Sequence, residues 1–194
     1  MARNEFYRTT RPEYSTGDRV AYFKKSCRQD PDKAVALGIQ LAVEFADKGN
    51  KARSALWFEK VYDLRPSYET ALKLATIYRE DFQDAETAVN WFECAYLHRP
   101  SGSLALGIGL IYANELDEPE KAVLWLKRSF DQMPTVETAG KLAQIYRYEL
   151  GDDESAKAWS DNLFRVRHGR NTVEPAPVAG HQLADILPQA LVQK

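Results

Sequence analysis

The sequence lacks the features that would direct a chain into a membrane or an oxidising compartment. No stretch approaches the ~20 apolar residues that a membrane-spanning helix needs. The N-terminal segment MARNEFYRTTRPEYSTGDR contains no apolar run of the kind found in a secretory signal. The two cysteines, Cys27 and Cys94, fit no metal or redox spacing, and reduced thiols are the simpler interpretation. These absences predict a cytoplasmic protein without membrane association.

A dominant charge and a catalytic constellation are also missing. The 26 basic and 28 acidic residues give a net charge of −2, with no basic stripe to meet a phosphate backbone, so nucleic acid is not the expected partner. No phosphate loop, nucleotide fingerprint or Ser, His and Asp set is present. The histidines, which stand at no metal-ligand spacing, are His98, His168 and His181. We therefore expect no enzyme activity, no cofactor and no metal.

The feature that the sequence does contain is an internal repeat of constant length. The four tryptophans stand at equal intervals, at Trp57, Trp91, Trp125 and Trp159, and this interval is the repeat length. Two further columns keep the same register: small residues at Ser54, Ala88, Ala122 and Ala156, and aromatic residues at Tyr62, Tyr96, Phe130 and Phe164. The three columns fall on one side of a helix, so the tryptophans are expected in the core. Each such helix should end near Pro66, Pro100 or Pro134.

A second helical pattern precedes the first in every unit. It reads small-x-x-Leu-small-x-x-aromatic, with Ile in place of Leu once, and begins at Gly38, Ala71, Ala105 and Ala139. The spacing i, i+3, i+4, i+7 predicts a helix, and its small residues allow another helix to approach closely. Short loops with turn residues such as Gly49 and Gly151 separate the two helices. Each unit is thus a helical hairpin that must stack on its neighbours to bury both stripes.

These residues resemble the tetratricopeptide repeat family in the period of about 34 residues, in the first-helix pattern and in the closing proline. The resemblance covers roughly residues 34–168. Alanine or glycine stands where that family has an early Trp, and the Ala-x-x-Trp of the second helix, as in AVNW and AVLW, is similar to Sel1-like repeats. Either family implies an all-α fold, an α-solenoid of about four helical hairpins that binds proteins. Residues 17–30, with Phe23 in the Trp column, look like an N-terminal half repeat that covers the first hairpin.

The chain is accordingly expected to contain four segments: an N-terminal tail (1–16), the solenoid (17–168), a linker rich in Pro and Gly (169–180) and a short amphipathic segment (181–194). The last segment carries an apolar stripe of Leu183, Ile186, Leu187 and Leu191. It either folds back over the last hairpin as a cap or docks in a groove of its own or of a neighbouring chain. A homodimer that exchanges this segment is one of the expected assemblies.

The resemblance also implies where a partner binds, because the first helices of such repeats line a concave surface. The positions carried over are mostly apolar and are bordered by basic residues: Ile39, Val43, Leu72, Lys73, Thr76, Arg79, Leu106, Leu110, Lys141, Gln144 and Arg147. Some members of the family hold a partner's C-terminal carboxylate in a clamp of Lys and Asn, and that clamp is absent here. An amphipathic helix or an extended peptide of some acidic character suits such a groove.

Two hypotheses of function remain from the sequence. The first is a protein-interaction module, such as an adaptor, a chaperone or a regulatory protein, that holds a protein or peptide partner in the groove. The second is an inhibitor or immunity-type protein that blocks a toxin or enzyme with an outer or end surface. RNA binding by a helical repeat is disfavoured by the strictly constant repeat length and by the acidic pI of about 6.0.

Overall fold

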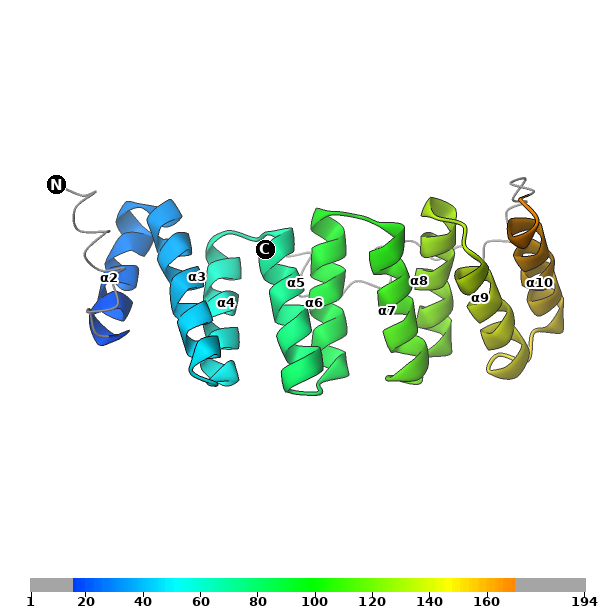
Figure 1. The fold of residues 1–194 in the computed structure, drawn as a ribbon, viewed down its shortest axis with the longest axis horizontal. Coiled ribbons are helices and arrows are strands. Elements are labelled where there is room, and N and C mark those ends of the chain that lie inside the picture. The colour runs from blue at the N-terminus through cyan, green and yellow to red at the C-terminus, as the bar shows by residue number, and fades with distance from the viewer. Residues whose placement is uncertain (1–15, 170–194) are drawn as a thin grey trace. The chain divides into compact units, whose positions relative to one another are not determined.

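A computed structural model of the chain describes residues 16–169, and all structural statements below concern that part. Within it every regular element is helical, with nine α-helices, one π-helical segment and no strand (Figure 1). The predicted all-α class is confirmed. The helices form two compact units that divide between Asp84 and Ala85, and each unit is described separately. The predicted linker and C-terminal segment lie beyond the described residues, as does nearly all of the N-terminal tail.

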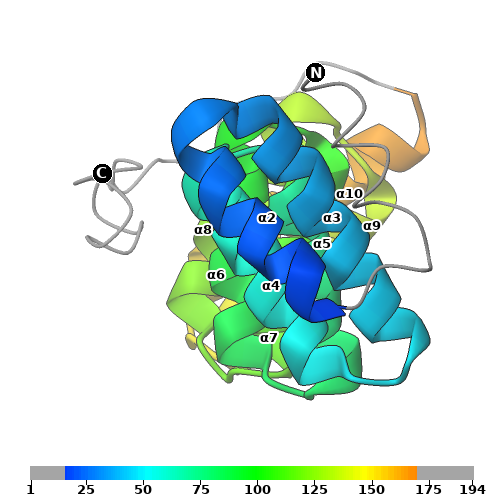
Figure 2. The ribbon, with the colours of Figure 1, turned by 90° about the vertical axis from the view of Figure 1, so that its left-hand side faces the viewer.

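The first unit contains the half repeat, a full hairpin and the first helix of the next hairpin. α2 (Thr16–Gln29) packs on α3 (Pro31–Asp47), and α3 pairs with α4 (Lys51–Leu64) (Figure 2). α5 (Tyr68–Thr76) packs on α4 and continues into η1 (Ile77–Asp81), a π-helical segment. The buried Arg19 of α2 forms an ion pair with Glu44 of α3, which ties the half repeat to the first hairpin.

The second unit begins with α6 (Ala85–His98) and contains two complete hairpins. α7 (Gly102–Asn114) pairs with α8 (Pro119–Gln132), and α9 (Val136–Tyr148) pairs with α10 (Asp153–Arg167). Within this unit each second helix also packs on the next first helix, α6 on α7 and α8 on α9. The stacking that the repeat pattern predicted is therefore present within this unit.

None of the helices between Thr16 and Gly169 has the length and apolarity to cross a membrane.

The closing prolines mark both the end of one helix and the start of the next. The second helices α4, α6 and α8 all end two residues before a proline. The residue after each proline is a hydroxyl side chain that accepts a hydrogen bond from the backbone N–H three residues later, at Ser67, Ser101 and Thr135. Such N-caps satisfy a backbone donor that the first turn of a helix leaves free. A Pro-Ser or Pro-Thr pair thus fixes the boundary between hairpins.

The turn inside each hairpin also recurs with the period of the repeat. One residue with positive φ lies in every turn, each one repeat length after the last: Gly49 (73°), Gln83 (56°), Asp117 (54°) and Gly151 (66°). The turn roles predicted for Gly49 and Gly151 are confirmed, because glycine adopts this conformation without steric cost. The same conformation at Gln83 was not predicted, since a long side chain disfavours it. The backbone path is evidently set by the hairpin and not by the residue type.

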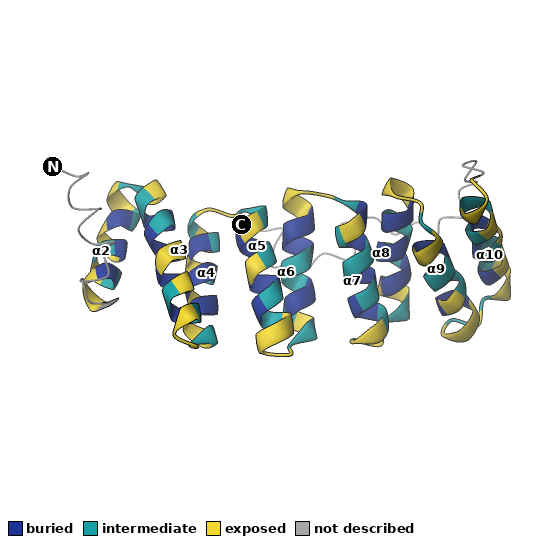
Figure 3. Ribbon diagram, in the orientation of Figure 1, coloured by how far each residue is buried: buried dark blue, intermediate teal, exposed yellow. Residues whose placement is uncertain are grey.

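The tryptophan column forms the core, with one exception. Trp57, Trp125 and Trp159 are buried, as predicted, whereas Trp91 is only partly buried. Each of the buried three makes a T-shaped contact with another ring: Phe23 meets Trp57 at 4.8 Å between ring centroids, Tyr96 meets Trp125 at 4.9 Å and Phe130 meets Trp159 at 5.0 Å, all close to perpendicular. Edge-to-face rings stabilise a fold beyond the area they bury. In Figure 3 the buried colour accordingly lies where helices of the same unit face one another.

Small residues permit the close approach of the two helices in a hairpin. A Cβ atom built on Gly38 would lie 2.5 Å from Val61 Cγ2 and 3.2 Å from Phe23 Cε2, so α4 and α2 both pack directly against this backbone. A Cβ built on Gly109 would lie 2.8 Å from Leu126 Cγ and 3.2 Å from the Leu126 backbone nitrogen. The predicted role of the small columns is thus confirmed at these two positions.

Two glycines of α7 provide a matched test of this packing. Gly107→Ala meets no atom within 4 Å and should raise the free energy of unfolding by ~0.5 to 1 kcal/mol, because alanine is the better helix former. Gly109→Ala should instead lower it by ~1 to 3 kcal/mol, because α8 must move away. Urea denaturation of both variants measures the difference. An equal stabilisation by both substitutions would show that the contact with Leu126 is not tight.

Candidate protein-binding surface

The residues predicted to form the groove all lie on first helices or on the π-helical segment that extends one of them. α3 and α5 carry five of them in the first unit, η1 carries Arg79, and α7 and α9 carry the remaining five. The structure therefore places them in two sets, one in each unit. A single groove that joins both sets stays a prediction.

In the first unit the apolar part of the set is exposed on α3. Ile39 is 39% exposed and Val43 is 46% exposed, and the two are one turn apart on the same side of the helix. On α5, Leu72 and Thr76 are partly buried, and the Thr76 hydroxyl donates to the Leu72 carbonyl oxygen at 2.9 Å. This hydroxyl is engaged with its own helix, so α3 presents the main apolar surface of the set.

In the second unit the corresponding leucines are less exposed. Leu106 and Leu110 of α7 are both partly buried. Lys141 of α9 donates to Asn114 Oδ1 of α7 at 2.9 Å, a bond that brings these two first helices together at one end. Gln144 and Arg147 are exposed on α9. Arg147 is thus accessible on α9, whereas Lys141 is bonded within the unit, and the basic border of a groove stays a prediction.

The structure shows polar contacts between successive copies of the repeat, which the sequence analysis did not predict. The Tyr78 hydroxyl donates to Glu59 Oε1 at 2.6 Å, and the Tyr112 hydroxyl donates to Glu93 Oε1 at 2.8 Å. The partners of both pairs are 19 residues apart in the sequence, and the second pair follows the first by one repeat length. In the next copy a lysine replaces the glutamate, and Lys127 lies over the Tyr146 ring at 5.4 Å from its centroid. The sequence does indicate these contacts, because a charged residue stands two positions after every Trp.

Glu93 is unusual among these groups because it is completely buried. Its exposed fraction is 0%, while Glu59 at the equivalent position is partly exposed. Burial raises the pKa of Glu93 to about 6, against the hydrogen bond from Tyr112 and the charges of Lys121 and Arg128, which lower it. Burial and the Glu93 carboxylate also raise the pKa of the Tyr112 hydroxyl. A carboxyl that titrates near pH 6 therefore lies inside the second unit.

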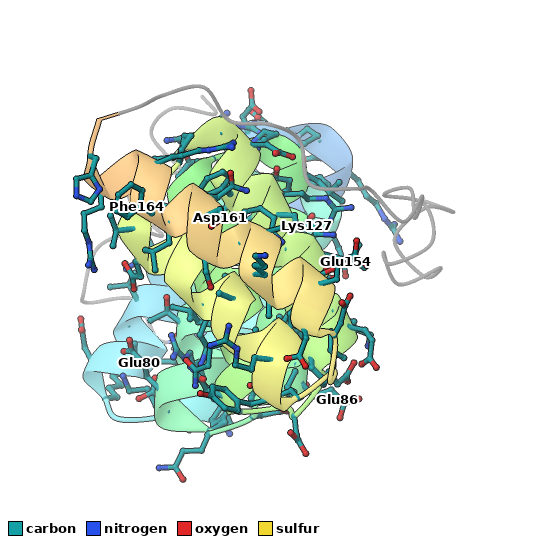
Figure 4. All side chains as sticks on the ribbon, turned by 90° about the vertical axis from the view of Figure 1, so that its right-hand side faces the viewer. Glu80, Glu86, Lys127, Glu154, Asp161 and Phe164 are labelled. Carbon is teal, nitrogen blue, oxygen red and sulfur yellow. The ribbon has the colours of Figure 1, made fainter. Side chains whose placement is uncertain are left out.

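α10, the last helix of the described residues, has a face that no other described helix covers. Asp161 and Phe164 project from α10 on the side that Figure 4 turns to the viewer. Phe164 is 56% exposed, although the aromatic residues of the same column in this unit, Tyr96 and Phe130, are 6% and 1% exposed. Phe164 differs from them because no following tryptophan packs on its ring among the described residues.

The histidines and acidic residues among residues 16–169 form no metal site. No group of three His, Cys, Asp or Glu side chains in that range is placed to hold a metal ion. His168 stacks on Phe164 at 4.1 Å between ring centroids and shares a hydrogen bond with the Phe164 carbonyl oxygen at 2.8 Å through Nδ1. The His168 side chain thus contacts the last turn of its own helix, α10.

Comparison with known proteins supports the fold. No family model matches the chain, and no curated protein sequence matches it. Among solved structures, MamA AMB-1 in the P212121 form has a TM-score of 0.54 at 17% identity, over 81% of this chain and 96% of that one. A second structure of MamA has a TM-score of 0.53 at 16% identity, over 78% of this chain and 88% of the other. The likeness shows the fold, an all-α solenoid of helical hairpins.

The buried carboxyl makes stability depend on pH in a defined direction. Because the folded pKa of Glu93 is raised from 4.5 to about 6, its contribution to stability is greatest below pH 4.5 and is lost as the pH rises through about 6. At pH 7 the charged form costs roughly 2 kcal/mol. Glu93→Gln, whose side-chain oxygen can still accept from Tyr112, should recover up to that amount at pH 7.

Urea denaturation between pH 4.5 and pH 7 measures this effect, with Glu59→Gln as the matched control at the equivalent, partly exposed position. The Glu93→Gln variant should lose the component of pH dependence that Glu93 supplies in this window, whereas the control should retain it. An unchanged pH dependence in Glu93→Gln would contradict the assignment of a raised pKa to this carboxyl.

Proposed function

We propose that the chain is a protein-interaction module that binds an amphipathic helix or an extended peptide on its first helices. The observation that carries this proposal is the pair Ile39 and Val43, two apolar side chains that α3 leaves 39% and 46% exposed in adjacent turns. Neighbouring apolar positions on a helix are the usual anchors for a partner helix or peptide. The fold supports the proposal, since a stack of hairpins buries its second helices and leaves one side of its first helices open.

The charges near this surface favour a partner with acidic residues. Lys73 and Arg79 are exposed in the first unit, and Arg147 is exposed in the second. They lie on α5, η1 and α9, the elements that carry part of the predicted groove. Electrostatic complementarity of this kind determines the orientation and association rate of a partner more than its affinity. The apolar anchors should therefore supply most of the binding energy.

A second candidate function is inhibition of another protein through the outer surface, and a separate observation favours it. The second helices also leave apolar side chains in solvent: Leu56 is 48% exposed and Leu97 is 46% exposed. An immunity-type or inhibitory protein would use such outer positions. The two functions differ in which set of helices a partner contacts, so one set of variants separates them.

Selection of binders from a displayed library of random peptides tests the first function, with Ile39→Glu/Val43→Glu and Leu106→Glu/Leu110→Glu as groove variants. Each double substitution should weaken the selected peptides by tenfold or more, which corresponds to about 1.4 kcal/mol or more, because a carboxylate would have to be desolvated at an apolar contact. Leu97→Glu is the control on a second helix. Titration calorimetry gives the affinities.

Loss of binding in the Leu97→Glu variant with full retention in both groove variants would reject the groove and favour the outer surface. Circular dichroism of all three variants confirms that the helices remain folded. Because the substituted side chains are exposed or partly buried, large losses of helicity are not expected.

A further inference from the structure

The open face of α10 has a defined counterpart in the preceding second helices. Three columns of the repeat form this face, two residues before the Trp, two after it and five after it. In α6 these positions hold Val89, Glu93 and Tyr96, all of them buried. In α10 they hold Lys157, Asp161 and Phe164, all of them exposed. The face that receives the next first helix in α6 and α8 is thus uncovered in α10 among the described residues.

The exposed face of α10 keeps an aromatic residue, Phe164, beside its polar residues. Lys157 replaces a column that is Val89 and Val123 in the preceding copies, which suits a terminal position. Phe164 nevertheless keeps the aromatic column and exposes 56% of its surface beside Asp161 (Figure 4). A face that is partly polar and partly aromatic suits a small cover, such as one helix, better than a complete hairpin.

The sequence beyond the described residues contains the pattern that this face would receive. Residues 180–187 read GHQLADIL, which is small-x-x-Leu-small-x-x-apolar and matches the first-helix pattern of the repeats. Its Gly180 corresponds to Gly38, and its Leu183 and Ala184 correspond to Leu41 and Ala42.

This additional copy is displaced from the regular register. One repeat length after Ala139 stands Val173, whereas the copy begins at Gly180, so seven residues have been added before it. At the regular spacing the pattern would fall on residues 173–180, which contain Pro175 and Pro177 and do not match it. The added residues therefore lengthen the connection to α10 and leave the first-helix pattern intact.

We propose that residues 177–187 form a fifth first helix that docks on the open face of α10 in the same chain. A lone second helix (α2) would then lie before the first described hairpin and a lone first helix after the last described hairpin. Pro177 would lie at the position of Val136, the first residue of α9, where a proline is well tolerated. Pro188 follows Leu187 and would end the helix.

The connecting segment is long enough for docking within one chain. Nine residues separate Arg167, the last residue of α10, from Pro177, and they can span roughly 30 Å. α10 itself, with 15 residues, is about 22 Å long. The proposed helix can therefore reach any part of the α10 face. A second copy stacked end to end would offer α2, a second helix that lacks the first-helix pattern, so the chain's own segment is the better occupant.

The docked helix should be held less firmly than those inside the stack. In the interface between α6 and α7, Tyr112 bonds to the buried Glu93 at 2.8 Å. The corresponding pair here would be Leu187 and Asp161, which form no such bond. The binding of this helix must therefore come from its leucines and from the exposed ring of Phe164. Measurable but incomplete protection of its backbone amides is the expected result.

Hydrogen exchange of the full chain, followed by mass spectrometry, tests the proposal at residues 183–187. In the wild type these amides should exchange about tenfold or more slowly than in an unstructured peptide. Phe164→Glu and Leu187→Glu should each remove most of that protection. Two controls should leave it unchanged: Tyr148→Ala, which truncates another exposed aromatic side chain of the same unit, and Gln182→Glu, which places a carboxylate on the opposite side of the proposed helix.

Light scattering at several protein concentrations accompanies the exchange experiment. A monomer with concentration-independent protection supports docking within the chain. Protection that grows with concentration, together with a dimer mass, would overturn the proposal in favour of exchange between two chains. Exchange at the rate of an unstructured peptide, or protection that is insensitive to Phe164→Glu, would overturn it as well. The unfolding temperature of the helices verifies that Phe164→Glu, a substitution at an exposed position, leaves the hairpins folded.

Discussion

The aromatic contact on each buried tryptophan is the interaction on which the rest of the structure depends. Phe23, Tyr96 and Phe130 each make a T-shaped contact with a tryptophan of a later helix, at 4.8 to 5.0 Å between ring centroids. A hairpin alone cannot bury an indole of this size, so the contact makes each hairpin require a neighbour. The same requirement explains why the stack needs a cover, which α2 supplies through Phe23 before the first hairpin.

The different roles of the first and second helices of each hairpin follow from this aromatic core. Second helices carry the tryptophans and the aromatic column, and small residues such as Gly109 let the first helices lie close against them. One side of each first helix is then left for solvent, where Ile39 and Val43 stand exposed. Binding positions can change there without loss of the core, which is the physical basis for a common interaction scaffold.

Polar groups add register to this apolar stack at some cost in stability. The bond from Tyr112 to Glu93 can form in one alignment of α6 and α7 only, but it places a carboxyl in the core and raises its pKa to about 6. The replacement of this glutamate by Lys127 in the next copy shows that the position accepts either charge, provided that a tyrosine ring or hydroxyl meets it. Asp161 of α10 has no such tyrosine opposite it among the described residues.

The sequence by itself determined the period, the helical hairpins and the closing prolines, because these depend on local spacing and on one strong apolar pattern. It predicted burial of all four tryptophans, which is confirmed for three and wrong for Trp91, a residue that is only partly buried. It also located the candidate binding positions on first helices, through a resemblance and not through contacts. Only the tertiary structure decided which polar residues meet, that Glu93 is fully buried while Glu59 is not, that Gln83 adopts positive φ, and that no helix among residues 16–169 covers Phe164. These properties depend on which residues pack opposite a given side chain. A repeat pattern lists equivalent positions along the chain, and it does not say which of them has a neighbour at the end of the stack.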